Sequence, residues 1–410
     1  MKRIAYILLL SGLLTNSCTN TSTSDSNQIV IRNPTAAERP DAFFTITADE
    51  LPAELAEADL RELVVYQGES PLPCQANDLD DDGRADELAC VVDLMPDASK
   101  TLTLDTTTDP PSFPSRTQAE LSHKVDGYWE DREYMGGSFQ NVQELHVPEE
   151  HTDHSYYIRY EGPGWESDRV GYRFYLDWRN ATDIFGKRTT DLVLQDVGQD
   201  GFDSYHELDD WGMDVLKVGE SLGLGSLAKW HNNRAERVAM TDSLYCAVAY
   251  SGPVESMIRT KYYGWQTGEE KTDVTSSLSI QAGSRLTKHH VQLSAAVDSL
   301  CTGIVQLENT AVLRGSGEKW NYLATWGAQS LNEDNLGMAV IYRQADELAV
   351  TRDSMSHVVV LNPVDQELTY YFLAAWELEP NGITDQAAFQ AYLEETLERL
   401  DKPVNVTLAE

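Results

Sequence analysis

The sequence predicts a mostly β protein: a large antiparallel β-sandwich of the supersandwich kind, a smaller N-terminal β domain before it, and one C-terminal helix. Most apolar stretches after residue 28 are short and rich in Tyr, Trp, Val and Thr, which is typical of strands. Only one segment shows a strong helical stripe, and no internal repeat is evident. Many strands with few helices favour packed sheets.

The N-terminal residues indicate an address for export. Residues 1–3 are basic, and the apolar stretch 4–14 is too short to span a bilayer but suits a signal peptide. Cys18 precedes a Ser/Thr/Asn-rich tether over 19–28, which resembles a bacterial lipoprotein signal (1–18) with Cys18 lipidated after cleavage. Ordinary secretion is the alternative. The first reading anchors the protein to the cell envelope, in the periplasm or at the outer membrane, through that lipid alone.

Two β domains and a helix follow. We expect the small N-terminal domain over 29–105 and the sandwich over 116–410, separated by a proline-containing linker. Predicted strands of the sandwich include 155–161, 171–179, 257–265, 274–293, 320–326, 337–342, 357–361 and 368–376. Near the end, Thr384 is the expected helix cap and Pro403 follows the helix. The stripe of this helix is Phe389, Leu393, Leu397 and Leu400.

Export makes the remaining four cysteines candidates for disulfides, because an even number in an oxidising compartment favours pairing. They are Cys74, Cys90, Cys246 and Cys301. Of three connectivities we favour Cys74–Cys90, around an acidic turn, together with Cys246–Cys301. Buried free thiols are the alternative.

The acidic turn itself resembles the start of a calcium loop. Asp78, Asp80 and Asp82 occupy positions one, three and five, Gly83 permits a sharp turn at six, and Asp86 stands at nine. Position twelve is an alanine, so this is not a complete EF-hand. A structural Ca²⁺ and a metal-free acidic hairpin remain open, and no other cofactor is required.

Composition excludes several classes of protein. With 67 acidic and 31 basic residues the net charge is −36, which repels phosphate backbones and argues against nucleic-acid binding. The chain has no nucleophile elbow, zinc-protease motif or nucleotide loop.

The densest run of chemically useful side chains lies between residues 151 and 179. With a period of two, Tyr172, Phe174, Leu176 and Trp178 form an apolar core face, and Arg173, Tyr175, Asp177 and Arg179 form the opposite face. Tyr157, Arg159 and Glu161 share a face of the preceding predicted strand. Two such faces suggest a polar groove. A solvated sheet face with ion pairs is the alternative.

Further candidates surround this groove. The predicted binding residues are His151, Glu161, Trp165, Glu166, Arg173, Asp177, Asp203 and His206. The last two belong to a loop rich in Gly and Asp that is followed by Trp211, a composition that suits sugar recognition.

Several of these runs carry a resemblance. Residues 116–120, 151–155, 159–168, 175–180 and 198–206 are similar to a secreted family, number 4861 of the domains of unknown function. The resemblance implies a place in polysaccharide utilisation and, from one such protein, an oligosaccharide dehydratase that removes water from a terminal uronate during ulvan breakdown.

That reaction can be matched to residue types. It needs a positive group for the carboxylate, a base for the carbon-bound proton and an acid for the leaving hydroxyl. Arg159 or Arg179 suits the first, His154 the base, and Tyr157 or Tyr175 the acid. A polysaccharide lyase would use the same set, a glycoside hydrolase would need two carboxyls such as Glu161 with Glu166 or Asp177, and a non-catalytic sugar-binding lipoprotein would need no base.

Overall fold

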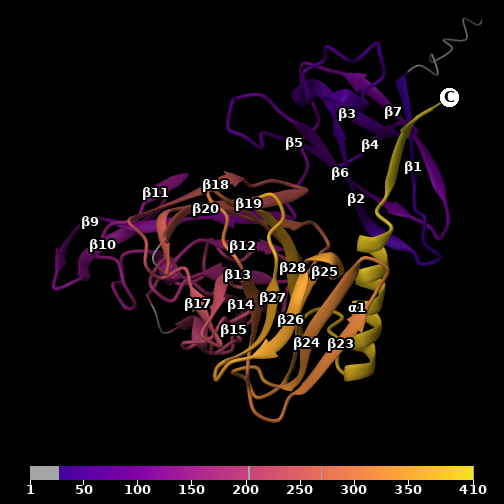
Figure 1. Cartoon of the computed structure of the whole chain (residues 1–410). Coiled ribbons are helices and arrows are strands. Elements are labelled where there is room, and N and C mark those ends of the chain that lie inside the picture. Colours follow the sequence, from indigo (N-terminus) through magenta and orange to yellow (C-terminus); the bar gives the residue numbers. More distant parts are fainter. Residues whose placement is uncertain (1–26, 202–203, 269, 410) are drawn as a thin grey trace, which may run out of the picture.

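The computed structural model describes residues 27–201, 204–268 and 270–409. In these ranges antiparallel strands dominate and α1 (Gln386–Asp401) is the single α-helix, so the mostly β class is confirmed (Figure 1). Cys18, the export signal and tether through residue 26, and Asp203 lie outside the described residues.

Both ends of the described chain form one small unit of two sheets. The first sheet has the order β29 (Asn405–Leu408), β1 (Gln28–Arg32), β7 (Ser99–Thr106), β3 (Leu63–Gln67) and β4 (Ser70–Pro71). The second has the order β2 (Arg39–Thr47), β6 (Glu87–Leu94) and β5 (Cys74–Asn77). Ile29 lies opposite Leu408, and Val404 and Val406 pack on the core of this unit. The expected sandwich boundary at 410 is therefore wrong for the last strand, which pairs with β1 in the N-terminal unit (Figure 1).

The larger part is built on a nine-stranded sheet. Its order is β11 (Glu144–His146), β18 (Ser243–Tyr250), β19 (Glu255–Thr267), β20 (Glu270–Gln281), β21 (Leu286–Leu293), β28 (Glu367–Trp376), β25 (Asn335–Arg343), β24 (Trp320–Ala328) and β23 (Ala311–Ser316). All its pairings are antiparallel.

Two five-stranded sheets supply the opposite layer. One has the order β15 (Gly212–Asp214), β14 (Thr182–Lys187), β13 (Gly171–Phe174), β12 (Gly164–Ser167) and β8 (Thr117–Glu120). The other has the order β17 (Arg234–Arg237), β16 (Ala228–His231), β22 (Leu300–Val305), β27 (Ser356–Leu361) and β26 (Glu347–Arg352). Beside them, the hairpin of β9 (Ser122–Glu130) and β10 (Glu133–Asn141) extends from the body (Figure 1).

Alternation along the central strands explains the layers. On β28, Tyr370 and Phe372 face the core shared with the five-stranded sheets, whereas Leu373 and Ala375 face α1. Side chains of a strand point alternately to its two faces, so an apolar run such as this one is buried on both.

The helix covers the outer face as its stripe predicts. Phe389, Leu393 and Leu397 are buried against the nine-stranded sheet, and Leu400 packs partly on the same cluster. The cap is Asp385 rather than Thr384, because its carboxylate accepts a hydrogen bond from the backbone N–H of Ala388 at 2.8 Å. None of the described helices has the length and apolarity that a membrane crossing requires.

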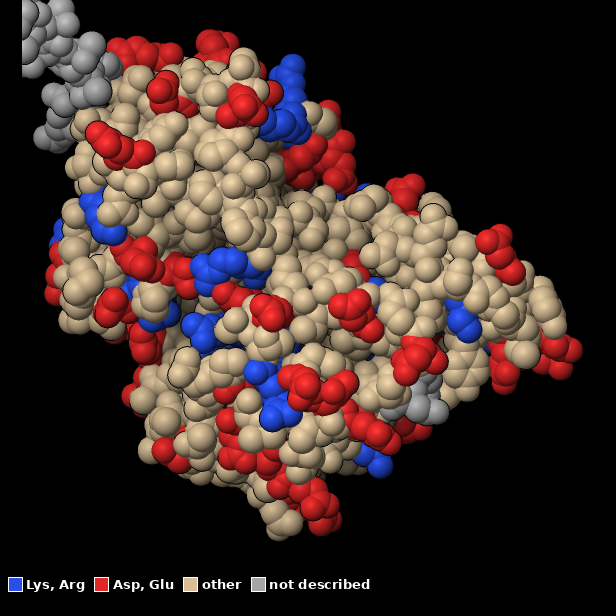
Figure 2. All heavy atoms as spheres, turned by 180° about the vertical axis from the view of Figure 1, so that it is seen from behind, with Lys and Arg blue, Asp and Glu red and all other residues tan. Residues whose placement is uncertain are grey.

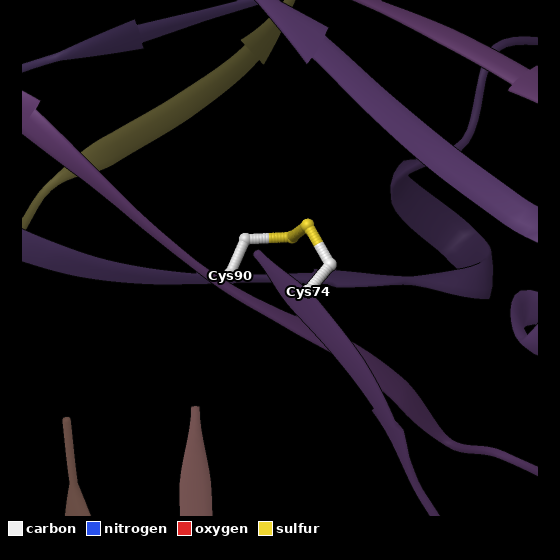
Figure 3. The surroundings of a disulfide bond; sticks show 2 residues. All are labelled: Cys74 and Cys90. Atoms are coloured by element: carbon white, nitrogen blue, oxygen red, sulfur yellow. A yellow bond between two sulfur atoms is a disulfide. The ribbon is translucent and has the colours of Figure 1, made fainter. Parts of the chain in front are cut away.

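One of the two predicted disulfides is present. Cys74 and Cys90 are directly paired across β5 and β6, with Cα atoms 4.2 Å apart, and form a disulfide (Figure 3). Cys246 and Cys301 are both free and buried. The predicted Cys246–Cys301 bond is wrong because β18 and β22 belong to different sheets, and the two thiols pack in different apolar clusters.

The acidic loop between β5 and β6 is closed by its own carboxylates. Asp78 accepts from the backbone N–H of Gly83 at 2.8 Å, and Asp86 from that of Leu79 at 2.6 Å. Oxygens of Asp78, Asp80 and Asp86 lie within 4.8 Å of one another, whereas Asp82 accepts from the backbone N–H of Arg84. The calcium site stays a prediction.

Candidate active site

The segment from His151 to Glu161 is irregular and not the predicted strand. It ends in a short 3-10 turn, η4 (Arg159–Glu161). Positive φ angles at His154 (58°), Tyr156 (56°), Tyr160 (37°) and Glu161 (70°) break the alternation of side chains on which the strand prediction depended. Non-glycine residues adopt this region at a cost, and such strain concentrates at functional sites.

As a result Arg159 and Glu161 do not share a face. The Arg159 guanidinium is fully buried, pairs with Glu120 and donates to the carbonyl of Gln195 at 2.8 Å. A buried guanidinium with these partners has no access to a substrate carboxylate, so the catalytic role expected for Arg159 is wrong.

The second predicted strand is confirmed over its first half, as β13. Tyr172, Phe174 and Leu176 are buried in the core, as the period of two predicts. Trp178 is 43% exposed instead, beyond the end of β13, with the Arg237 guanidinium over its ring at 5.4 Å.

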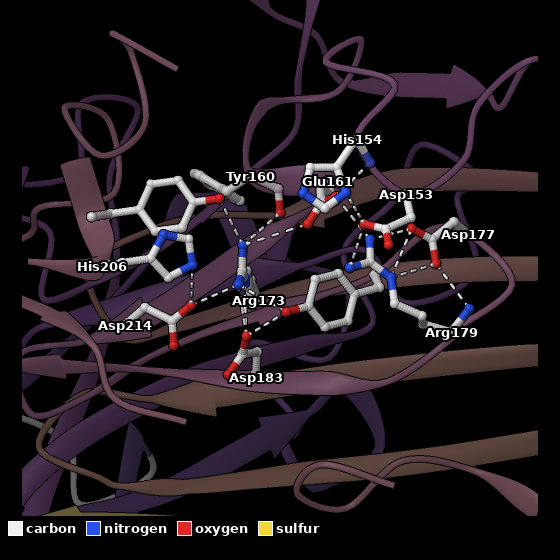
Figure 4. Close-up of polar contacts among 12 residues, drawn as sticks. Asp153, His154, Tyr160, Glu161, Arg173, Asp177, Arg179, Asp183, His206 and Asp214 are labelled. Atoms are coloured by element: carbon white, nitrogen blue, oxygen red, sulfur yellow. Dashed lines mark hydrogen bonds and ion pairs between the residues drawn. The ribbon is translucent and has the colours of Figure 1, made fainter. Parts of the chain in front are cut away.

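Arg173 emerges on the other side of β13 into a buried polar network (Figure 4). Its guanidinium donates to Asp183 at 2.7 Å, to Asp214 at 2.6 Å and to the Tyr205 hydroxyl at 3.0 Å. Tyr175 donates its hydroxyl proton to Asp183 at 2.6 Å. Because this phenol is buried and committed to Asp183, the predicted role of Tyr175 as the acid is not supported by its position.

Arg179 joins a neighbouring set of carboxylates. It pairs with Asp177, with Asp153 at 2.9 Å and with Glu161 at 2.9 Å. Burial favours the neutral form of Glu161, but Arg173 and Arg179 outweigh it and lower the pKa of Glu161 to about 2. Asp177 is buried beside Arg179, so its contact is with the arginine and its predicted role in binding substrate is not supported.

His154 lies at the open edge of this network. Its Nδ1 is 2.8 Å from Asp153 Oδ1, and its backbone N–H donates to Glu161 at 3.1 Å. Half of the His154 side chain is exposed. A carboxylate beside Nδ1 favours the tautomer in which Nδ1 carries the proton and Nε2 is the basic nitrogen, an arrangement suited to proton abstraction.

A second histidine meets the network from the other side. His206, in the 3-10 turn η5 (Ser204–His206), places Nε2 3.5 Å from Asp214 Oδ2 and keeps a third of its side chain exposed. Burial and the neighbouring Asp183 raise the pKa of Asp214 well above its usual value. Figure 4 shows His206 beside Asp214 on one side of Arg173 and His154 beside Asp153 on the other.

A small cavity of about 30 Å³ lies beside His154 and Glu161. It is lined by Lys124, Phe139, His154, Tyr156, Ile158, Tyr160, Glu161, Gly201 and Tyr205. Tyr205 also lines an adjoining open cleft of about 760 Å³, whose walls include Asp191, Asp209 and Trp211. The cavity has the volume of one or a few waters, so a larger ligand would lie outside it, against the exposed parts of His154 and Tyr156.

Four predicted residues lie elsewhere. Trp165 and Glu166 are fully buried, and Glu166 bonds to Lys187 Nζ at 2.6 Å, so neither can bind substrate as predicted. Tyr157 packs against His123, Trp129 and Tyr134 and does not line the cavity. His151 is buried with Nδ1 2.7 Å from the Ser155 hydroxyl, and burial lowers its pKa to about 4.

Sequence reasoning missed Lys124, Tyr156 and Tyr205 as cavity residues. Lys124 comes from β9, distant in sequence, and only the fold brings it beside His154. Tyr156 falls on the wrong face of the predicted strand. The aromatic composition of 205–211 was the available signal for Tyr205.

Charge balance decides which cation can receive an anionic ligand. Five carboxylates surround Arg173 and Arg179, so both guanidiniums are fully engaged. No carboxylate of the described ranges lies within ion-pair distance of Lys124. Over the molecule as a whole acidic groups predominate, as one face shows in Figure 2. Lys124 is therefore the cavity residue suited to an anionic ligand.

Fold and site together define a β-sandwich protein with a histidine–carboxylate pocket at the edge of a buried ion network. The family model "Domain of unknown function (DUF4861)" matches residues 31–406, and the chain belongs to this family.

Two solved structures are similar to the chain. An alpha-mannosidase from Enterococcus faecalis V583 shares 10% identity with a TM-score of 0.47, covering 94% of this chain and 46% of that one. A protein in the glycosyl hydrolase family 38 from Enterococcus faecalis shares 8% identity with a TM-score of 0.45, covering 94% and 48%. The chain spans about half the length of each. Among curated proteins none matches it.

Proposed function

We propose that the protein is a carbon–oxygen lyase, a dehydratase that eliminates water from the terminal uronate of polysaccharide-derived oligosaccharides. Ulvan-type oligosaccharides are the proposed substrates. The observation that carries the proposal is the half-exposed His154, held by Asp153 at the mouth of a pocket that also contains Lys124. A base beside a cation that no carboxylate of the described residues engages is what abstraction of a proton next to a carboxylate requires.

Four residues have distinct roles in the proposed elimination. Lys124 binds the uronate carboxylate and stabilises the negative charge that develops on it. His154 Nε2 removes the proton from the ring carbon next to the carboxylate, and Asp153 stabilises the imidazolium that forms. Arg179 holds Asp153 and Glu161 in place and does not touch the substrate.

The carboxyls predicted for the hydrolase alternative are engaged inside the protein. Glu161 is engaged by Arg179, and Glu166 is fully buried against Lys187. Two carboxyls flanking a glycosidic bond are needed for hydrolysis. From the sequence we further propose export and a lipid anchor at Cys18, with an acidic oligosaccharide as partner.

The test is incubation with uronate-terminated oligosaccharides, followed by ultraviolet absorbance and mass spectrometry. Dehydration gives a conjugated double bond, loss of one water and unchanged chain length. A double bond with shorter chains would instead indicate a polysaccharide lyase, and new reducing ends without absorbance a hydrolase. Binding without any conversion would leave a sugar-binding lipoprotein and overturn the proposal.

A further inference from the structure

The buried ion network also contacts a second partly exposed histidine, His206, which has no role in the mechanism proposed above. His206 contacts Asp214 through Nε2, just as His154 contacts Asp153 through Nδ1. Asp214 is in turn bonded to Arg173, which lies 3.9 Å from Glu161. One ion network thus contacts two partly exposed imidazoles, and each imidazole lies beside a carboxylate of the network.

Tyr205 connects the two histidines in space. Its ring lies 4.5 Å from the His206 ring, and the same residue lines the cavity together with His154 and Tyr156. Its hydroxyl is held by Arg173 at 3.0 Å. This contact fixes the wall between the cavity and the adjoining cleft, and it places His206 next to the residue that both share.

We infer that His206 is a catalytic residue, the general acid that protonates the leaving hydroxyl while His154 acts as the base. The inference rests on the proposed elimination and adds the group that completes it.

The tyrosines of the site are weaker candidates for this acid. Tyr175 gives its proton to Asp183 inside the protein. Burial raises the pKa of Tyr205 to about 12, although Arg173 opposes the shift. In general an imidazolium is a stronger acid than a phenol by about three to four pKa units, and it carries the proton that a hydroxyl needs to depart as water.

The protons and electrons balance without a co-reactant. His154 takes the proton from the carbon next to the carboxylate, and the electrons of that bond form the new double bond. The bond from the adjacent carbon to its hydroxyl oxygen breaks, and that oxygen takes a proton from His206. The enzyme ends with His154 protonated and His206 neutral, and exchange with solvent resets both.

A substrate with a leaving group that needs no proton separates the two histidines. We would compare the natural uronoside with one in which fluorine replaces the leaving hydroxyl, and measure fluoride release and double-bond formation. His206→Gln should slow loss of water by about 10²-fold or more but release fluoride within a few-fold of the wild type. His154→Gln should be slow with both substrates. His231→Gln, an exposed histidine on β16, is the matched control.

Thermal unfolding of each variant, and His206→Asn as a second substitution, distinguish a chemical from a folding defect. Equal slowing of His206→Gln on both substrates, unimpaired water loss, or fluoride rescue in Tyr156→Phe instead would overturn the role of His206 while the elimination stands. A wild-type protein that releases neither water nor fluoride would overturn the proposed function and this inference with it.

Discussion

His154 Nδ1 lies 2.8 Å from Asp153 Oδ1, and the same Asp153 oxygen lies 2.9 Å from Arg179. One carboxylate therefore orients the exposed imidazole and is itself fixed by a guanidinium that is almost entirely buried. The arrangement holds the imidazole in place without burying it.

Removing this imidazole should disable chemistry and spare the fold. For His154→Gln we expect turnover to fall by about 10²-fold or more, because general-base catalysis contributes on that scale. Half of the side chain is in solvent, so the unfolding temperature should change little. Initial rates and thermal unfolding are measured side by side with His231→Gln; a large loss of stability confined to His154→Gln would contradict the assignment.

Arg159→Ala should instead lower the stability of the fold. Truncation leaves Glu120 buried without its partner, which costs about 3–5 kcal/mol of unfolding free energy. Urea denaturation measures this loss. Lys124→Ala provides the contrast, because Lys124 should matter for activity and little for stability. A stable Arg159→Ala protein without activity would restore the role predicted from the sequence.

Lowering the pH should reduce the free energy of unfolding because Glu161 becomes protonated. Its folded pKa of about 2 lies below the value near 4.5 of an unfolded glutamate, so the unfolded chain binds the proton first as the pH falls. The resulting stabilisation, about 3 kcal/mol, is complete above about pH 4.5 and is lost as the pH falls towards 2. Urea unfolding at several pH values should therefore show a shallower acid decline for Glu161→Gln than for wild type or the exposed control Glu149→Gln. Parallel curves would refute this.

The disulfide should be single and stabilising. We expect non-reducing peptide mapping to find Cys74 linked to Cys90, with Cys246 and Cys301 alkylated only after unfolding. A crosslink over 16 residues restricts the unfolded chain by about 3 kcal/mol. The Cys74→Ala/Cys90→Ala variant should lose about that much in urea denaturation. A Cys246–Cys301 peptide in the map would contradict the structure.

Calcium is expected to stabilise the small N-terminal unit if the acidic loop binds it. Saturating Ca²⁺ at about a hundred times its dissociation constant would add about 2.7 kcal/mol. Thermal unfolding with Ca²⁺ and with chelator should then differ in wild type and in Asp97→Asn, an exposed control, but not in Asp80→Asn. Identical curves for the wild type would mean that the loop is an ordinary acidic hairpin.

Local patterns in the sequence predicted the parts of the fold that depend on local physics. The alternation of Tyr172, Phe174 and Leu176 placed them in the core, and the short spacing of Cys74 and Cys90 suited a hairpin. The apolar stripe from Phe389 to Leu397 packs against the nine-stranded sheet, as the helical spacing predicted.

The sequence did not predict those parts of the site whose geometry depends on unusual backbone conformation or on residues distant in sequence. Positive φ angles at Tyr160 and Glu161 turn the chain inside a stretch whose composition looks like a strand. Arg159 finds Glu120 inside the protein, a partner that no local pattern reveals. Lys124 reaches the cavity because β9 passes beside it, which only the assembled sheets specify.

The pairing of β1 with β29 sets an order of events during synthesis. The ribosome releases the first strand of the small sheet long before its edge partner exists, so that edge remains unpaired until the rest of the chain has emerged. Since domains usually fold as they are made, β29 closes a sheet begun by β1, and a chain truncated before β29 would leave the edge of β1 unpaired.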